Sequence, residues 1–483
     1  MTTMTAPRPA ASAATVASPP AFDPTPDAPL HLAGLRVHFV GVGGCGMSGL
    51  ARIAQANGAR CTGSDLAASP ATAALAAQGI AVTHEQSAAA LPADAQALVI
   101  SAAVKPDHPE VAEARRRGLP VLKYAQMLGR LMIGRTAVAV AGTHGKSSTT
   151  SMLSHVLIQA GLDPSFIVGA TCRQIGGGAR VSSVNGPILV AEACEFDRSF
   201  HNFHPTHSLI LNVEVDHLDV YAGIEEIVES FAVFARKLPA DGSLLIHHES
   251  PHRLAITADL PCRVETIGFA PQSDWKVHCN GDRLVRLYHD NTQVAAWHSP
   301  MPGEHMAYNA AAAAVTAHRL GASWDAITAA LAGFQGLDRR MQRIGERQGV
   351  TVIDDYGHHP TEVDTTLRAL RRHYNPQRLV CVFQPHQHSR TRFLLNEFAA
   401  SFSAADLVVV PDIYFSRDSE AERRAVTASD LVDRLRHRRV AAMHLYPFAA
   451  IVEQLHMITR PGDLIVTMGA GDVWKIARDY VAA

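Results

Sequence analysis

The chain has 483 residues, of which 47% are hydrophobic and 18% charged, and its formal net charge is −2 at pH 7. This composition is typical of a globular protein with large cores, and the near-neutral charge gives no reason to expect nucleic acid as a partner. At roughly 150 residues per domain, the length predicts about three domains. No apolar run reaches the ~20 residues that span a bilayer, so we expect no membrane insertion.

The chain divides into a leader and three blocks. Residues 1–30 are rich in Ala, Pro, Ser and Thr and lack the basic start and apolar core of a signal peptide, so we expect a disordered leader. Blocks at residues 31–134, 135–336 and 337–483 each alternate apolar strands with amphipathic helices. This alternation predicts an α/β fold of three domains with mostly parallel sheets. The seven scattered cysteines contain no CxxC pair, which favours the reducing cytoplasm.

The first block opens with a strand over residues 35–40, a glycine-rich turn and a helix over residues 46–57. The turn contains a GxGxxG pattern, and Asp65 follows the next strand. Such glycines let the backbone approach a diphosphate at a helix N-terminus, so a nicotinamide dinucleotide and a UDP-sugar fit equally well. The block is therefore expected to be Rossmann-like. Its candidate ligand-binding residues are Gly41, Gly43, Gly44, Gly46, Met47, Ser48 and Asp65.

The second block opens with an apolar strand that leads into GTHGKS, residues 142–147, and a helix from Thr149. Such a turn directs backbone N–H groups and a helix N-terminus at one point, where phosphate is stabilised. We expect Lys146 to reach the outer phosphates of ATP and Ser147 to ligate Mg²⁺, although Val140 replaces the first glycine of the full P-loop pattern. The loop residues expected to bind ATP are Gly142, Thr143, His144, Gly145, Lys146, Ser147 and Ser148.

Polar residues follow two further strands of this block. Glu192 ends the strand over residues 188–192, and NVEVDH, residues 212–217, ends the strand over residues 207–212. Mg²⁺ prefers oxygen ligands, and ATP-cleaving sites commonly use one or two carboxylates. We therefore expect Ser147 and Glu192 to hold Mg²⁺, with His217 as a ligand or near-ligand. Three nearby histidines fit no familiar zinc spacing and are expected to be structural: His201, His204 and His207.

Further polar groups flank the start of the third block. His305 and Asn309 precede an alanine-rich helix over residues 310–320, and their spacing would place them on one helical face. GLDRR, residues 336–340, suggests a hinge whose guanidinium groups can meet phosphate. The third block has strands over residues 350–354 and 378–383, followed by DDYGHHPTE and QPHQHSRTR. Their histidines and arginines, including His386 and Arg390, suit an anionic substrate.

Taken together, these stretches resemble the Mur ligases of peptidoglycan synthesis, over nearly the whole chain from residue 31. GTHGKS, Glu192, NVEVDH, the His305 and Asn309 pair, and GLDRR occur in the order typical of that family. Within it, GVGGCGMSG, DDYGHHPTE and FQPHQHSRT are most similar to the branch that adds L-alanine to UDP-N-acetylmuramate.

The resemblance implies a ligase in which ATP phosphorylates the lactyl carboxylate of UDP-N-acetylmuramate. The amine of L-alanine then attacks the acyl phosphate, and ADP and phosphate are released. It also implies ATP and two Mg²⁺ ions as cofactors, a monomer or homodimer, and a cytoplasmic role in cell-wall precursor synthesis, hence in cell shape and division.

The resemblance also assigns residue roles. His305 and Asn309 would contact adenine or ribose, Tyr356 would stack on the base, and Arg340 would approach the phosphates. The glycine turn would take the UDP part. The residues implied in catalysis are Lys146, Glu192, His217, His386 and Arg390.

Three positions depart from the family pattern. Cys194 stands where the acidic run after Glu192 usually has Asp, Met306 stands where Asn commonly follows the histidine, and Gln387 stands where a basic residue is frequent. Lys237 is not assigned the role of the carbamylated lysine that other members use.

Three other hypotheses remain. A recycling ligase of the same family would add a whole peptide to the same sugar, but that branch tends to carry Phe-Ala where DDYGHHPTE has Tyr-Gly. An NAD-dependent dehydrogenase accounts for the GxGxxG pattern but leaves GTHGKS unexplained. A non-catalytic nucleotide-binding protein is favoured only by the three departures.

Overall fold

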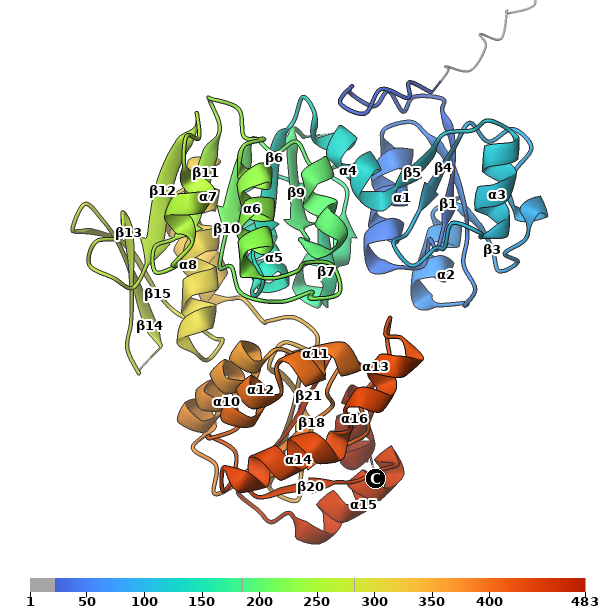
Figure 1. The fold of residues 1–483 in the computed structure, drawn as a ribbon. Coiled ribbons are helices and arrows are strands. Elements are labelled where there is room, and N and C mark those ends of the chain that lie inside the picture. Colours follow the sequence, from blue (N-terminus) through green and yellow to red (C-terminus); the bar gives the residue numbers. More distant parts are fainter. Residues whose placement is uncertain (1–21, 184–185, 282, 483) are drawn as a thin grey trace, which may run out of the picture.

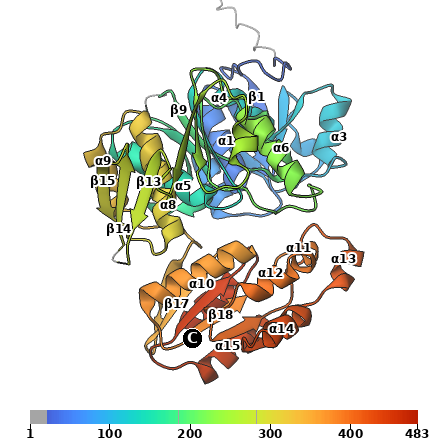
Figure 2. The same ribbon diagram turned by 60° about the vertical axis from the view of Figure 1, so that its left-hand side comes forward.

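The computed structural model describes residues 22–183, 186–281 and 283–482. The described chain forms three α/β domains, each built around its own sheet (Figures 1 and 2). The sheets are mostly parallel, as the alternation of strands and helices predicts, and each lies within one of the three expected blocks.

The first domain has a five-stranded parallel sheet in the order β3-β2-β1-β4-β5. Because the order reverses between β1 and β4, the turn after β1 opens at a topological switch point, where such sheets bind ligands. The expected first strand and helix agree with β1 and α1 to within one residue at each end. The elements are β1 (Arg36–Val40), α1 (Cys45–Ala56), β2 (Arg60–Ser64), α2 (Pro70–Ala77), β3 (Ala81–Thr83), β4 (Ala97–Ile100), α3 (Pro109–Arg116), β5 (Val121–Lys123) and α4 (Tyr124–Met132).

The second domain has a ten-stranded sheet in the order β15-β14-β13-β12-β11-β10-β6-β9-β7-β8. Its central strand β6 is apolar beyond its first residue and buried on both faces, as expected of an inner parallel strand. The strands are β6 (Thr136–Ala141), β7 (Ser165–Cys172), β8 (Gly177–Arg180), β9 (Ile188–Ala193), β10 (His207–Ile210), β11 (Ser243–His247), β12 (Arg263–Gly268), β13 (Trp275–Cys279), β14 (Leu284–His289) and β15 (Thr292–His298). The helices are α5 (Lys146–Gln159), α6 (Ile224–Ala235), α7 (Arg253–Thr257), α8 (Glu304–Arg319) and α9 (Trp324–Ala332).

Two helices of this domain begin earlier than expected. Helix α5 starts at Lys146 rather than Thr149, because Gly145 caps it in the left-handed conformation with φ of 82°. Helix α8 starts at Glu304, six residues before its alanine run, so His305 and Asn309 both lie within it. Its small residues let α8 pack against α5, which brings its first turns beside the GTHGKS loop.

The third domain has a six-stranded sheet in the order β16-β17-β21-β18-β19-β20, in which only β16 is antiparallel. The polar stretches after β17 and β18 therefore lie at the same edge. The strands are β16 (Gln342–Arg347), β17 (Val350–Asp355), β18 (Leu379–Phe383), β19 (Leu407–Val410), β20 (Ala442–His444) and β21 (Leu464–Met468). The helices are α10 (Pro360–Tyr374), α11 (His388–Phe393), α12 (Leu395–Ala400), α13 (Glu420–Ala425), α14 (Ala428–His437), α15 (Phe448–Ile458) and α16 (Trp474–Ala482).

The domains are joined in two different ways. Helix α1 packs directly on β7 and β8, and a Cβ atom on Gly49 would lie 2.5 Å from the Cβ of Ala179, so only glycine fits there. The third domain lies below the other two in both views and connects to them through residues 333–341, which include the predicted hinge (Figures 1 and 2).

The expected leader is described only in part, because residues 1–21 lie outside the described chain. Residues 22–30 rest on the first domain, where Arg130 of α4 donates hydrogen bonds to the carbonyl oxygens of Asp23 and Ala28. Among the described residues, no helix combines the length and apolar character needed to cross a membrane.

Candidate active site

Two neighbouring cavities lie where the domains meet. The central cavity, about 470 Å³, is lined by all three domains, through Cys45 of the first, Lys146 and Glu192 of the second, and His386 and Arg390 of the third. The second cavity, about 350 Å³, lies at the start of α8 and is called the α8 cavity here. Residues expected to act together, but separated by more than two hundred positions in the chain, thus line one continuous region.

The GTHGKS loop separates the two cavities. Lys146 and Ser147 face the central cavity, Ser148 faces the α8 cavity, and His144 and Gly145 line both. The loop conformation depends on glycine at 145, because a Cβ atom there would lie 2.7 Å from Oδ1 of Asn309. Helix α8 therefore supports the loop directly.

Lys146 is held by the loop and by a carboxylate. Its Nζ donates to the carbonyl oxygens of Gly142 and Thr143 and lies 2.9 Å from Oε2 of Glu195. Burial alone would lower the pKa of Lys146, but the adjacent Glu195 carboxylate raises it above its ordinary value. The ammonium is therefore charged at neutral pH, as a phosphate-binding group must be.

Glu192 projects into the central cavity from the end of β9. Its Oε1 accepts a hydrogen bond of 2.7 Å from the backbone N–H of Gly169. Burial raises the pKa of Glu192, and hydrogen bonds from Gly169 and Ser147 act in the opposite direction. A hydroxyl and a carboxylate are thereby placed together, which is the oxygen donor pair expected for Mg²⁺.

His217 provides a further candidate ligand. Its Nε2 lies 3.8 Å from both Glu195 and Asp216, and its buried Nδ1 has no hydrogen-bond partner in the described part of the chain. Burial lowers the pKa of His217, so the imidazole is neutral, the form that binds metal. A neutral imidazole without a close hydrogen-bond partner on Nδ1 among the described residues, together with the Ser147 hydroxyl and the Glu192 carboxylate, supplies donors of the kinds that fit the implied ions.

A buried ion pair joins the second domain to the third across the central cavity. Arg390 of α11 donates through Nε and Nη2 to Oδ1 of Asp216, at 3.0 and 2.8 Å. Burial alone would raise the pKa of Asp216, but Arg390 holds it well below its usual range. Arg390 also lies 3.3 Å from Nδ1 of His386, whose pKa burial lowers to about 4.

The residues expected around the base are divided between the cavities. His305 and Asn309 line the α8 cavity, where burial lowers the pKa of His305 to about 4. Tyr356 lines the central cavity instead, with the guanidinium groups of Arg339 and Arg340 5.0 and 4.9 Å from its ring centre. Arg340 lines both cavities and can reach a ligand that extends from one to the other.

The glycine turn of the first domain borders a third cavity of about 260 Å³, between α1 and β8. Gly43 and Ser48 line it, whereas the Met47 side chain is buried in the core, so Met47 can meet a ligand only through its backbone. The carboxylate of Asp65 accepts a 2.8 Å hydrogen bond from the N–H of Gly43 and so closes the turn. Gly41, with φ of 76°, begins the turn, and Gly44 and Gly46 lie at the start of α1.

The site also contains residues that the sequence did not assign, among them Glu195, Asp216, Asp355 and Arg417. Glu195 and Asp216 stand within recognisable motifs, but their partners are distant in the chain. Arg417 lies in a loop without a recognisable motif. Its Nη2 donates a 3.0 Å hydrogen bond to Oε1 of Gln387, and its guanidinium lies 4.2 Å from the ring centre of Phe196.

The three departures from the family pattern occupy different positions. Cys194 lines the central cavity, and Met306 lies at the α8 cavity with its sulfur 3.9 Å from Nδ2 of Asn309. Gln387 is buried, and its side chain holds Arg417, so a cation reaches the cavity from a neighbouring loop.

Three family models match the chain in sequence order. They are "Mur ligase family, catalytic domain" over residues 36–136, "Mur ligase middle domain" over residues 140–317 and "Mur ligase, glutamate ligase domain" over residues 339–471. Together they match most of the chain and agree with its division into three domains.

Individual proteins are similar over the whole of these domains. The UDP-N-acetylmuramate–L-alanine ligase of Lachnospira eligens is 39% identical over 454 residues, covering 92% of this chain and 98% of that protein. The protein of the same name from Desulfitobacterium hafniense is 38% identical over 454 residues, covering 92% and 99%.

Solved structures share the fold. The UDP-N-acetylmuramate-alanine ligase of Thermotoga maritima superposes with a TM-score of 0.76 at 24% identity, covering 93% of this chain and 98% of that one. The murein peptide ligase of Psychrobacter arcticus superposes with a TM-score of 0.69 at 24% identity, also covering 93% and 98%. At these identities the likeness establishes the three-domain architecture alone.

Proposed function

The chain belongs to the Mur ligase family, and we propose that it joins L-alanine to the lactyl carboxylate of UDP-N-acetylmuramate in the cytoplasm, with cleavage of ATP to ADP and phosphate. Relatives named UDP-N-acetylmuramate–L-alanine ligase are 38–39% identical over 92% of the chain. We expect a monomer or homodimer, which light scattering distinguishes.

One observation carries the proposal: the central cavity combines groups for phosphoryl transfer with groups for an anionic acceptor. Lys146, Ser147 and Glu192 come from the second domain, and His386 and Arg390 come from the third. Lys146 and Arg340 offset the charge on the transferring phosphoryl group. Ser147 and Glu192 would hold one Mg²⁺ and His217 would hold or orient a second, and the ions would supply Lewis-acid stabilisation of the phosphates.

The three substrates would enter from three sides. The α8 cavity takes the base and ribose of ATP between His305 and Asp355. The glycine turn takes the UDP part, so that the lactyl carboxylate points into the central cavity. Arg417 and His386 receive the carboxylate of L-alanine from the side of the third domain. Closure of the domains would keep water from the acyl phosphate.

The test is ADP release by the purified protein with Mg²⁺, ATP and UDP-N-acetylmuramate, with acceptors offered one at a time. Release that requires both the sugar nucleotide and L-alanine is the expected result, and mass spectrometry should find the alanyl product. Release that a whole peptide supports and L-alanine does not would identify a recycling ligase and overturn the proposal. Nucleotide binding without any release would leave a binding protein.

A further inference from the structure

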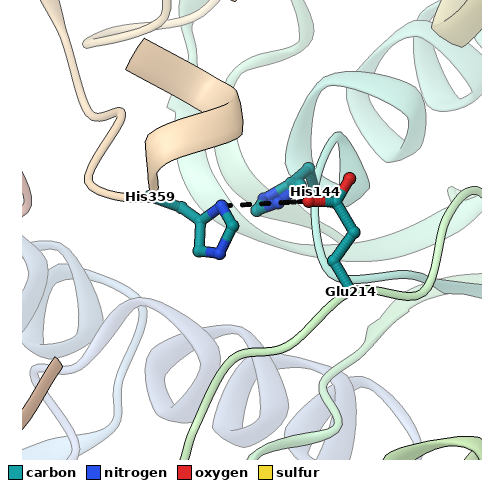
Figure 3. A group of neighbouring side chains, drawn as sticks. All are labelled: His144, Glu214 and His359. Carbon is teal, nitrogen blue, oxygen red and sulfur yellow. Dashed lines mark ion pairs between the residues drawn. The ribbon is translucent and has the colours of Figure 1, made fainter. Parts of the chain in front are cut away.

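Three side chains at the boundary between the second and third domains converge on one point (Figure 3). His144 comes from the GTHGKS loop, Glu214 from the loop after β10, and His359 from the start of α10. Each offers one ligand atom, and these atoms all lie within 4.8 Å of one another. Oε2 of Glu214 is 3.6 Å from Nε2 of His144 and 4.0 Å from Nδ1 of His359.

In each imidazole, the ring nitrogen that points away from Glu214 already has a partner in the protein. Nδ1 of His144 lies 3.2 Å from Oε1 of Glu362, and Nε2 of His359 lies 3.1 Å from the carbonyl oxygen of Val215. Carboxylates and backbone carbonyls in these positions are the usual partners of metal-binding histidines, because they fix the ring and the tautomer. The nitrogens that remain are those directed at Glu214.

The two ring nitrogens directed at Glu214 differ in how the protein satisfies them. Nε2 of His144 is buried and has no hydrogen-bond partner within the described residues. The His359 side chain is the N-cap of α10, and its Nδ1 accepts a long 3.3 Å hydrogen bond from the N–H of Thr361. The Thr361 hydroxyl donates to Glu214 at 2.6 Å. A metal ion at Nδ1 would have to displace this cap. A buried orphan nitrogen facing a carboxylate needs a partner, and a cation would satisfy it.

We propose that His144, Glu214 and His359 form a binding site for one divalent transition-metal ion such as Zn²⁺, separate from the Mg²⁺ ligands Ser147, Glu192 and His217. Two imidazoles and one carboxylate suit Zn²⁺, Co²⁺ or Ni²⁺, whereas Mg²⁺ favours oxygen.

The site lies between the second and third domains, so a bound ion would connect them. His359 belongs to the third domain and the other two ligands to the second, so an ion bound by all three ties the domains together. His144 and Glu214 also line the α8 cavity, where a fourth coordination position would open. A bound transition metal is therefore expected to hold the closed arrangement and to slow any cycle that requires opening.

The test is calorimetric titration of Zn²⁺ into untagged, full-length, nucleotide-free protein with millimolar Mg²⁺ present throughout. We expect one Zn²⁺ per chain, and Co²⁺ should give the visible absorption bands of a low-coordinate site. His359→Gln and Glu214→Gln should each weaken binding by about tenfold or more. His437→Gln, at an exposed histidine on α14, is the matched control and should bind as the unaltered protein does.

Three outcomes would overturn the proposal. If both ligand variants bind Zn²⁺ with the affinity of the unaltered protein, or if the unaltered protein shows no saturable binding, these residues do not form a site. Loss of Zn²⁺ binding in His217→Gln would assign the ion to the Mg²⁺ ligands instead. Circular dichroism and melting curves of every variant separate a lost ligand from a lost fold.

Discussion

Charged side chains in the centre of the molecule are paired with one another. Lys146 pairs with Glu195, and Asp216 pairs with Arg390, both with little exposure to solvent. A buried charge destabilises the folded state unless an opposite charge compensates it, so removing one member of a pair leaves the other buried and uncompensated. Substitutions here are therefore expected to affect both the chemistry and the local structure, and each needs a partner variant as a control.

Lys146→Ala should lower the rate of ADP formation by at least about 100-fold, because no other group replaces an ammonium at the phosphates. Glu195→Gln keeps the lysine and removes only its ion-pair partner, so its loss of rate should be smaller. Steady-state assays of both variants, with circular dichroism to check folding, make the comparison. Equal rates in Lys146→Ala and the unaltered protein would contradict the assigned role.

Arg417→Ala should raise the KM for L-alanine by about tenfold, equivalent to roughly 1.4 kcal/mol of binding, with little change in the KM for ATP. Gln387→Ala should act in the same direction but more weakly, since Gln387 only holds the guanidinium. Arg423→Ala, at an exposed arginine on α13, is the matched control. Parallel rises in both KM values would place Arg417 elsewhere in the mechanism.

Asp355 predicts a pH dependence of stability. Burial raises the pKa of this carboxyl to about 6 from its ordinary value of 3.8. The folded state thus binds the proton more tightly, so the unfolding free energy falls as the pH rises from about 4 to 6. Asp355→Asn should abolish this part of the dependence, which amounts to roughly 3 kcal/mol.

Chemical unfolding of Asp355→Asn and the unaltered protein at several pH values measures this difference. Asn cannot accept both backbone hydrogen bonds, from Met341 and Gly357, that the carboxylate accepts. That loss adds an offset that does not change with pH. A stability difference that is constant across the range would contradict the raised pKa.

At the scale of elements, the nucleotide loop depends on the contact between α5 and α8. Gly145 has a φ of 82°, and the side chain of Asn309 on α8 lies so close that a Cβ atom at position 145 would collide with it. The alanines of α8 make this approach possible, because small residues let the two helices pack closely. The loop is thereby placed between the two cavities by a helix that follows it in sequence by more than 150 residues.

Gly145→Ala should destabilise the protein by about 1–2 kcal/mol and abolish detectable ATP binding, since the added methyl is unfavourable at positive φ and meets Asn309. The double variant with Asn309→Ala removes the collision but keeps the backbone strain. It should recover only part of the stability, as melting curves and calorimetry with ATP can measure. Full recovery would mean that the collision alone matters.

At the scale of the whole molecule, the third domain is the one expected to move. The first domain is fixed to the second by close packing of α1 on β7 and β8. The third is joined by polar contacts, Asp216 with Arg390 and Glu214 with Thr361, by buried apolar residues that share one core cluster with the second domain, and by a hinge that contains Gly336 with φ of 90°. Polar contacts exchange with water at little net cost, which suits a domain that opens and closes.

Asp216→Asn should shift the molecule toward an open form. Its radius of gyration in small-angle X-ray scattering should increase, and ADP formation should fall, because Arg390 loses its buried counterion. Asp241→Asn, at an exposed aspartate of the same domain, is the matched control. An unchanged scattering profile would mean that other contacts maintain closure.

The sequence by itself determined the local chemistry. GTHGKS, the glycine turn and the strand-end carboxylates act through residues that are contiguous or nearly so, and the periodicity of apolar residues predicts the strands and helices around them. The three domains, their parallel sheets and the family could therefore be inferred before any coordinates. Helix starts were predicted less well, because a left-handed glycine and a polar first turn carry little periodic signal.

Only the tertiary structure decided which of these groups meet. Asp216 and Arg390 are 174 positions apart, and nothing local to either predicts the other. The same holds for Lys146 with Glu195, for Arg417 with Gln387, and for the cluster of His144, Glu214 and His359. The pairs within one domain depend on which strands and loops lie side by side in its fold, and those between domains depend on how the domains pack. Both are set by burial summed over many residues rather than by any single stretch of chain.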